Sequence, residues 1–348
     1  MNPELYMRRC FDLARKGAGK VAPNPLVGAV LVYNNRIIGE GYHTYYGGPH
    51  AEVNCINSVA DQDQAWIAQS CLYVNLEPCA HFGKTPPCAH LVVASGIKQV
   101  VIANRDPFEQ VNGNGIAYLE KNGVAVTCGL LEKEGLALNK VFFTNTIKKR
   151  PYIYLKWAET SDGFVGNSKQ RVPISNPLHK LWMQQVRAQI PSILVGRNTV
   201  SIDNPLLTSS FAKEQQATRL VIDPLLKLDR KACVFNNESN TIIFNFLKKD
   251  KQEHLEWVRL TEELPLPNQI ADYLHMHRIN AVLVEGGPYT LTEFIKNDMW
   301  DEAIVCVSEA SLKEGIKAPV LNKEIGTHTF TLKDNTISIY KHQDNPFI

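Results

Sequence analysis

The sequence lacks several features that would assign it to a specialised class of protein. No apolar run approaches the roughly 18 residues expected of a membrane-spanning helix. No tract is compositionally biased, and 44% of the residues are hydrophobic and 21% are charged, as in ordinary globular proteins. The formal net charge of +2 is too small to indicate a polyanionic partner. We therefore expect neither a nucleic-acid partner nor a membrane partner.

Signals for secretion and for a Rossmann domain are also missing. The eight cysteines are scattered over 348 residues and do not resemble a disulfide framework. Arg8, Arg9 and Asp12 interrupt the apolar pattern at the N-terminus, which argues against a secretory signal. No G-x-G-x-x-G follows a predicted strand, since the nearest case, Gly113-Asn114-Gly115, lacks the third glycine. We expect a cytoplasmic protein without a Rossmann domain.

The length of the chain suggests two α/β domains. Charge, a predicted helix end and a proline coincide near Thr146 to Pro151, so we place domains at residues 1–147 and 148–348. Predicted strands cover 27–33, 37–42, 71–76, 99–103, 124–128, 152–157, 192–195, 219–222, 241–244, 281–284, 302–307, 327–332 and 338–342. Leu5, Phe11, Leu13 and Ala14 form the face of a predicted N-terminal helix. Further predicted helices cover 51–59, 90–95, 116–121, a segment through 139, and 177–188, 270–277 and 290–295. The order in the first half favours one sheet with helices on both faces.

One group of residues in the first half has the composition of a catalytic zinc site. His50 offers an imidazole, and Cys79 and Cys88 offer two thiolates. Three protein ligands leave the fourth position of a tetrahedral zinc open to water, whose pKa the metal lowers to about 7. Glu52 lies two residues after His50 and can carry a proton from that water to a ring nitrogen and the departing amine. This pattern predicts a zinc-dependent deaminase.

The spacing of the two cysteines departs from the usual deaminase signature, in which two residues separate them. Here eight residues, 80–87, lie between them. The segments 22–28 (APNPLVG), 41–43 (GYH), 49–52 (PHAE), 76–81 (LEPCAH) and 83–88 (GKTPPC) nevertheless resemble the bifunctional riboflavin-biosynthesis deaminase/reductase family in sequence and order. The resemblance implies a cytidine-deaminase-like three-layer α/β/α domain followed by a dihydrofolate-reductase-like α/β domain.

The resemblance also implies two reactions and two cofactors. The first domain would deaminate a diaminopyrimidinone that bears a phosphoribosylamino group, and the second would reduce the ribose to ribitol with NADPH. Asn24 offers a donor and an acceptor to the edge of a pyrimidine, and Lys84 offers a charge to a phosphate. Thr85 and His43 offer uncharged polar contacts. Each of these residues, taken singly, also fits an ordinary loop.

The reductase half carries weaker motifs, in the segments 155–163, 195–200, 203–208 and 284–288. The glycines of the last segment permit a close approach of a phosphate to a helix N-terminus. By the resemblance, the residues that contact the dinucleotide are Ala158, Thr199, Asp203, Gly286 and Gly287. Those that contact the phosphoribosyl substrate are Lys156, Arg187, Leu207 and Glu285.

Some family positions are filled differently. Arg171 and Pro173 stand where the family commonly has serine and tryptophan, and Ser210 stands where it commonly has arginine. Serine cannot replace a bidentate phosphate ligand, although Arg171 offers a charge from another position. One alternative is therefore a deaminase whose second domain binds nucleotides or mediates assembly without reducing anything. Others are a nucleoside or tRNA deaminase and a non-enzymatic scaffold with an incidental metal site. The resemblance also implies a homo-oligomer, a dimer or tetramer.

Overall fold

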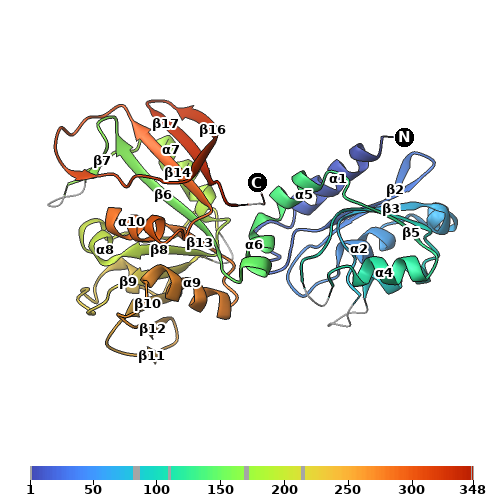
Figure 1. The fold of residues 1–348 in the computed structure, drawn as a ribbon, viewed down its shortest axis with the longest axis horizontal. Coiled ribbons are helices and arrows are strands. Elements are labelled where there is room, and N and C mark those ends of the chain that lie inside the picture. The colour runs from blue at the N-terminus through green and yellow to red at the C-terminus, as the bar shows by residue number, and fades with distance from the viewer. Residues whose placement is uncertain are drawn as a thin grey trace. The chain divides into compact units, whose positions relative to one another are not determined.

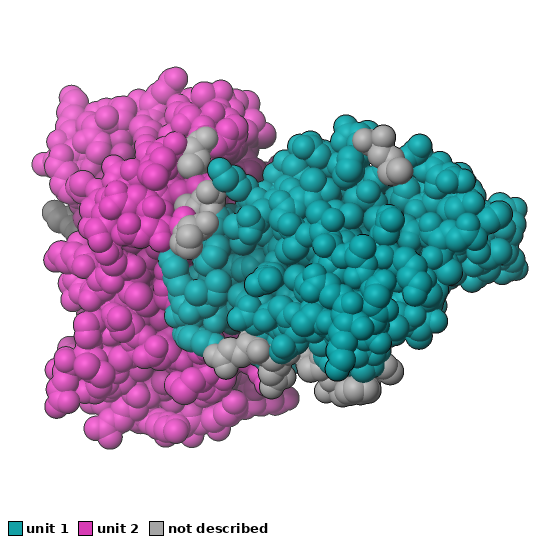
Figure 2. Space-filling model, turned by 45° about the vertical axis from the view of Figure 1, so that its right-hand side comes forward, with its two compact units in different colours: residues 1–149, 347–348 teal, residues 150–346 magenta. Residues whose placement is uncertain are grey.

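The computed structural model describes residues 2–80, 87–108, 111–167, 172–212, 216–345 and 347, apart from the side chain of Thr327. The chain divides into two compact units, residues 1–149 with 347–348 and residues 150–346, which Figure 2 colours separately. The expected boundary between residues 147 and 148 falls inside the last turn of helix α6 (Lys140–Lys148). Within the described residues, no helix has both the length and the apolar character needed to cross a bilayer.

The first unit is built on a five-stranded sheet in the order β2-β1-β3-β4-β5. The strands are β1 (Gly28–Tyr33), β2 (Arg36–Tyr42), β3 (Cys71–Leu76), β4 (Gln99–Asn104) and β5 (Ala125–Cys128). Strand β1 is antiparallel to β2 and β3, while β3, β4 and β5 are parallel. A 3-10 segment, Asp61–Gln69, leads into β3.

Helices cover both faces of this sheet, as Figure 1 shows. Helices α2 (Ala51–Asn57), α3 (Cys88–Ala94) and α4 (Asn114–Lys121) pack on one face, and α1 (Pro3–Arg15) and α5 (Glu132–Leu138) pack on the other. The central strand β3 serves both layers, because Leu72 and Val74 face the first group of helices and Tyr73 faces α1. The first unit is therefore the three-layer α/β/α domain that the sequence predicts.

The second unit contains a ten-stranded sheet in the order β11-β12-β10-β9-β8-β13-β6-β14-β17-β16. Its strands are β6 (Tyr152–Thr160), β8 (Ser192–Gly196), β9 (Thr218–Ile222), β10 (Thr241–Asn245), β11 (Asp250–Lys251), β12 (Leu255–Arg259), β13 (Ala281–Val284), β14 (Glu302–Ser308), β16 (Glu324–Leu332) and β17 (Asn335–His342). The seven strands from β12 to β14 in this order are parallel, and the strands outside them are antiparallel.

The helices of the second unit are α7 (Pro177–Arg187), α8 (Arg197–Asp203), α9 (Leu266–Met276) and α10 (Pro288–Lys296). Strands β7 (Phe164–Gly166) and β15 (Ile316–Lys317) pair with each other, and Cys233–Phe235 forms a short 3-10 turn. Helix α8, strand β12 and the short strands β7, β11 and β15 were not predicted from the sequence. Strand β12 buries only Trp257 fully, so it has no alternating pattern, and its pairing with β10 fixes it as a strand.

Gly41 allows β2 and α2 to approach closely, and this contact positions the start of α2. A Cβ atom at residue 41 would lie 2.2 Å from the backbone nitrogen of Cys55 and 2.5 Å from the carbonyl oxygen of Ala51. We expect Gly41→Ala to displace α2 and to cost about 2 kcal/mol or more, as overpacking of a core commonly does. Differential scanning calorimetry measures this as a lower melting temperature of the first unit.

The matched control is Gly326→Ala on β16. There the nearest atom to an added Cβ, on the ring of Tyr340, is 3.8 Å away, which is ordinary contact. If the two variants have the same melting temperature, the close packing of β2 against α2 does not contribute to stability as proposed.

Candidate functional site

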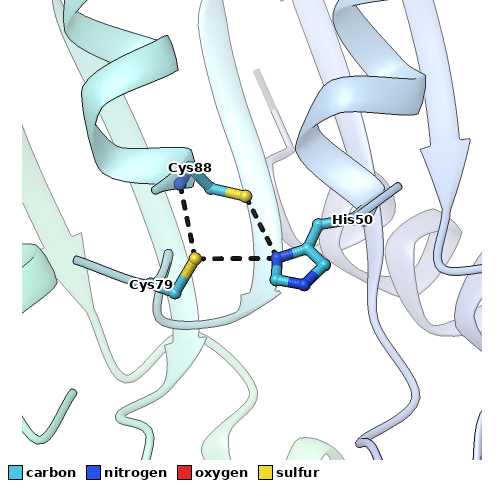
Figure 3. A group of neighbouring side chains, drawn as sticks. All are labelled: His50, Cys79 and Cys88. Atoms are coloured by element: carbon cyan, nitrogen blue, oxygen red, sulfur yellow. Dashed lines mark hydrogen bonds between the residues drawn. The ribbon is translucent and has the colours of Figure 1, made fainter. Parts of the chain in front are cut away.

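The structure brings together the three proposed metal ligands, which come from separate elements. His50 immediately precedes α2, Cys79 follows β3, and Cys88 is the first residue of α3. The Nδ1 atom of His50 lies 3.6 Å from the sulfur of Cys79 and 3.3 Å from the sulfur of Cys88 (Figure 3). Tetrahedral bonds to zinc would hold nitrogen and sulfur about 3.5 Å apart. The donor set therefore fits zinc, and no fourth such ligand joins the group within the part of the chain that is described.

The two thiols are not equivalent. Cys88 donates hydrogen bonds to the sulfur of Cys79, one of them from its backbone nitrogen at 3.3 Å, and His50 lies on the other side. These contacts lower the pKa of Cys79 to about 4, so its thiolate is present at neutral pH. The adjacent sulfur of Cys79 and burial raise the pKa of Cys88. Metal binding must therefore release a proton from Cys88.

Glu52 lies in the first turn of α2 and its side chain is buried. Burial, and next the negative charge of Cys79, raise the pKa of Glu52 to about 7. The carboxyl group lines a cavity of about 430 Å³ together with the ligands His50 and Cys79. A carboxyl group beside the metal ligands, with a pKa near neutrality, is suited to accepting and returning a proton.

Asn24 and His43 line the same cavity and contact each other. The Nδ1 atom of His43 lies 3.0 Å from the carbonyl oxygen of Pro49, so it must carry the proton and donate it. The Nε2 atom of His43 then accepts a hydrogen bond from the side-chain nitrogen of Asn24 at 3.1 Å. Burial lowers the pKa of His43, which keeps the ring neutral. This relay fixes the amide of Asn24 and leaves its carbonyl oxygen available to a ligand.

Two asparagines hold the backbone that carries Asn24. The side chain of Asn139 pairs with both the backbone nitrogen and the carbonyl oxygen of Leu26, at 2.8 and 2.9 Å. Asn75, on β3, accepts from the nitrogen of Gly28 at 2.7 Å and donates to the oxygen of Leu26 at 2.9 Å. The sequence analysis missed both. A polar residue inside the buried strand 71–76 is the signal that points to Asn75.

Asp106 is a further residue of the cavity that the sequence analysis missed. It follows β4, at the edge where the parallel strands β3 and β4 both end, which is a common place for functional side chains. Burial raises the pKa of Asp106 to about 7. Its place after a predicted strand end was the available sequence signal.

The Gly113-Asn114-Gly115 segment belongs to the scaffold of this cavity. The carboxylate of Glu77 accepts hydrogen bonds from the backbone nitrogens of Gly113, Gly115 and Ile116 at 2.9–3.1 Å. A Cβ atom at Gly115 would lie 2.0 Å from the carbonyl oxygen of Pro78. These glycines therefore allow α4 to pack against the residues just before Cys79. Lys84 and Thr85, the other two proposed substrate contacts, lie outside the described residues.

In the second unit, three of the proposed substrate residues form one charged group. Arg187, the last residue of α7, forms a bidentate pair with Glu285, with both distances 2.6 Å. Burial opposes the ionisation of Glu285, but the charge of Arg187 outweighs it and lowers the pKa. The ammonium group of Lys156 on β6 interacts with both charges and forms no hydrogen bond or ion pair with any described residue. The group has one unmatched positive charge, which suits an anionic ligand.

The proposed cofactor residues Gly286, Gly287 and Thr199 lie close together. A Cβ atom at Gly287 would meet nothing nearer than the hydroxyl of Thr199, at 3.5 Å. Gly286 packs against Thr290, where a Cβ would lie 2.8 Å from the threonine Cβ. Gly287 is the N-cap of α10 and has no side-chain cap, so the helix terminus is open to an anion. This cradle fits the phosphates of a dinucleotide.

The remaining predicted positions are more dispersed. Ala158 lies on β6 opposite Cys306, Asp203 ends α8, and Leu207 is buried with a φ of 54°. Among the described residues, no hydrogen bond joins Ala158 or Leu207 to the turn at 286–287. Pro173 is exposed, and the backbone nitrogen of Ser210 donates to Gln184 at 3.0 Å. Arg171 lies outside the described residues.

Comparison with known proteins agrees with this division. Residues 151–333 match the RibD C-terminal domain, and residues 1–104 match the cytidine and deoxycytidylate deaminase zinc-binding region. The chain is 38% identical over 321 residues to the riboflavin biosynthesis protein RibD of Aquifex aeolicus, which covers 89% of this chain and 88% of the relative. The chain belongs to the RibD family. It is therefore a bifunctional enzyme of riboflavin biosynthesis, with a zinc-dependent deaminase domain and an NADPH-dependent reductase domain.

One further relative matches only the first domain, and a solved structure matches both domains. The chain is 49% identical over 143 residues to a diaminohydroxyphosphoribosylamino-pyrimidine deaminase of Buchnera aphidicola, which covers 41% of this chain and 95% of the relative. A solved structure from Thermotoga maritima, a diaminohydroxyphosphoribosylaminopyrimidine deaminase/5-amino-6-(5-phosphoribosylamino)uracil reductase, superposes with a TM-score of 0.89. It is 34% identical and covers 97% of this chain and 98% of its own.

The metal centre leads to a prediction for Cys88→Ala. Removing one of three protein ligands should lower the zinc content at least tenfold under dilute conditions, because one Zn–S bond is lost. Elemental analysis after dialysis measures the zinc, and Cys128→Ser, at an exposed cysteine of the same unit, is the control. Full zinc occupancy in Cys88→Ala would rule out this ligand set.

Proposed function

We propose that residues 1–147 deaminate 2,5-diamino-6-(5-phosphoribosylamino)pyrimidin-4-one and that residues 148–348 then reduce its ribosyl chain with NADPH. The observation that carries the first step is the meeting of His50, Cys79 and Cys88 beside the buried carboxyl of Glu52. The similarity to the Buchnera deaminase and to the Thermotoga enzyme supports this choice of substrate.

His50, Cys79 and Cys88 would hold the metal of the deaminase domain. When bound, zinc activates a water molecule for attack on the amine-bearing carbon of the pyrimidine. Glu52 accepts a proton from this water and passes it to the adjacent ring nitrogen. It then accepts the proton of the newly added hydroxyl group and passes it to the amine, which leaves as ammonia while the C=O bond forms. Its burial excludes bulk water, so the proton stays between the carboxyl group and the substrate.

Asn24 would orient the pyrimidine. Its hydrogen bond to the neutral ring of His43 leaves the carbonyl oxygen and one N–H of the amide for the edge of the substrate. The pairing of Asn75 and Asn139 with Leu26 supports a rigid position for Asn24. Lys84 and Thr85 are proposed to contact the phosphoribosyl group.

Glu52→Gln tests the proton transfer. The variant keeps all three metal ligands, so we expect it to retain zinc, while turnover falls by roughly 100- to 10,000-fold as general acid–base catalysis is lost. The measurement is ammonia release from the diaminopyrimidinone substrate, with zinc content determined on the same sample. Near-normal turnover by zinc-loaded Glu52→Gln would exclude Glu52 as the proton carrier. The wild-type protein is also assayed with cytidine and with tRNA as substrates. Ammonia release from either would indicate a nucleoside deaminase or a tRNA deaminase instead.

The reductase step would use the charged group of the second unit. The unmatched charge of Lys156 supports binding of the anionic phosphoribosyl substrate, with Arg187 and Glu285 beside it. Leu207 is proposed as an apolar contact of the same substrate. The dinucleotide would lie against Gly286, Gly287 and Thr199, with Ala158 and Asp203 as further contacts. The cofactor supplies the hydride, and the protein supplies orientation and electrostatics.

Lys156→Met tests this assignment. Loss of a charge-assisted contact should lower kcat/KM for NADPH oxidation with the deaminated substrate by roughly 10- to 150-fold. Deaminase activity should be unchanged, and so should NADPH affinity measured by fluorescence titration. Lys180→Met removes an exposed lysine of α7 and serves as the control. If the wild-type protein shows no substrate-dependent oxidation of NADPH, this result favours the alternative in which the second domain only binds nucleotides or mediates assembly.

The protein acts on a small molecule, and two finer points remain predictions. We expect a homo-oligomer, a dimer or tetramer, which light scattering of the purified protein tests. We also expect a cytoplasmic location, which cell fractionation tests.

A further inference from the structure

His179 is a buried histidine of the second unit whose ring has no hydrogen-bond partner. Its side chain is 1% exposed, and neither Nδ1 nor Nε2 contacts a donor or acceptor among the described residues. The backbone explains only part of its position. The side chain of Asn176 caps α7 by accepting a hydrogen bond from the backbone nitrogen of His179 at 2.9 Å. The imidazole itself is not used by this cap.

The ring of His179 lies within electrostatic range of the charged group that we assign to the reductase substrate. His179, Met183 and Arg187 are spaced by four residues and share one face of α7, on which His179 and Met183 are buried. His179 also interacts electrostatically with Lys156 and Glu285. The imidazole is therefore near all three charged members of the group, although it pairs with none of them.

An unpaired imidazole at this depth is unfavourable for folding alone. Two polar atoms lose their hydrogen bonds to water and gain none in the protein. An apolar side chain of similar size would avoid this cost, as the buried Met183 does one turn later. Buried polar groups without partners are common where a ligand supplies the partner.

The charge state of the ring limits which ligand it can contact. Burial, and then the charge of Lys156, lower the pKa of His179 to about 3, with Arg187 and Lys180 acting in the same direction and Glu285 against it. The ring is therefore neutral near pH 7 and offers one N–H donor and one nitrogen acceptor. This pair matches a hydroxyl group, which both accepts and donates, better than it matches a phosphate.

We propose that His179 is a substrate-contact residue of the reductase site and forms hydrogen bonds with hydroxyl groups of the sugar chain that is reduced. In this arrangement Lys156 and Arg187 meet the anionic part of the substrate, and His179 meets its uncharged polyhydroxy part. The proposal rests on the reductase function proposed above.

The test compares two substitutions of His179 in the full-length, zinc-loaded protein. His179→Leu removes both hydrogen-bonding atoms, and we expect KM for the deaminated substrate to rise about tenfold. His179→Gln keeps one donor and one acceptor and should recover most of this loss. NADPH affinity, measured by fluorescence titration, should stay within about twofold of wild type in both. Met183→Leu, on the same helix face, is the packing control.

KM separates ligand contact from a purely structural role, because His179→Leu should melt at or above the wild-type temperature in either case. If His179 only fills space, His179→Leu will keep its KM, and this result would overturn the proposal. A matching loss of NADPH affinity would overturn it too, because His179 would then serve the cofactor. If His179→Leu does not fold, His179→Met, which also lacks both ring nitrogens, replaces it and is judged by the same criteria.

A failure of the proposed reductase function is recognisable separately. In that case the wild-type protein oxidises no NADPH, whatever residue stands at 179. The stabilisation of the protein by the deaminated substrate, measured as a rise in melting temperature, then replaces KM as the readout. If the substrate raises the melting temperature of the wild type but not of His179→Leu, the result supports the contact. An equal rise in both proteins, or no rise in the wild type, overturns it.

Discussion

The deaminase half depends on the convergence of one imidazole nitrogen and two sulfurs from the ends of three different elements. Their separations, 3.3 and 3.6 Å from the nitrogen of His50 to the two sulfurs, follow from the positions of α2, β3 and α3, which pack in one core. Gly41 and Gly115 make this possible, since each allows a helix to approach a neighbouring backbone more closely than a side chain would permit. The metal site is therefore a consequence of packing as much as of its ligands.

Around this centre the protein uses hydrogen bonds to hold uncharged groups in defined orientations. The carbonyl of Pro49 selects the tautomer of His43, and His43 in turn selects the orientation of Asn24. The site proposed for the reductase uses charge instead. Arg187 and Glu285 neutralise each other, which leaves the positive charge of Lys156 for an anionic ligand. The two sites thus suit the two ends of one substrate, a neutral ring and an anionic sugar phosphate.

Departures from the family pattern lie in the second half of the chain. Ser210 does not replace the missing arginine electrostatically, and its backbone pairs with Gln184 on α7. The same helix carries His179 and Arg187, so α7 would contribute to the proposed site near both of its ends. The helix pattern predicted α7 itself, but no spacing rule distinguishes a histidine that faces the charged group from one that packs in a core.

The sequence by itself determined the chemistry of the first half, because residue types and their order suffice to define a set of zinc ligands and a nearby carboxyl. It also determined the α/β class and most strands, since buried strands have strong apolar patterns. Only the tertiary structure decided which residues meet. Asn75 and Asn139 hold the backbone next to Asn24, and Asp106 lines the cavity, through contacts between distant segments. Strand β12 exists through its pairing with β10. Such contacts depend on how elements pack, which local sequence patterns do not encode.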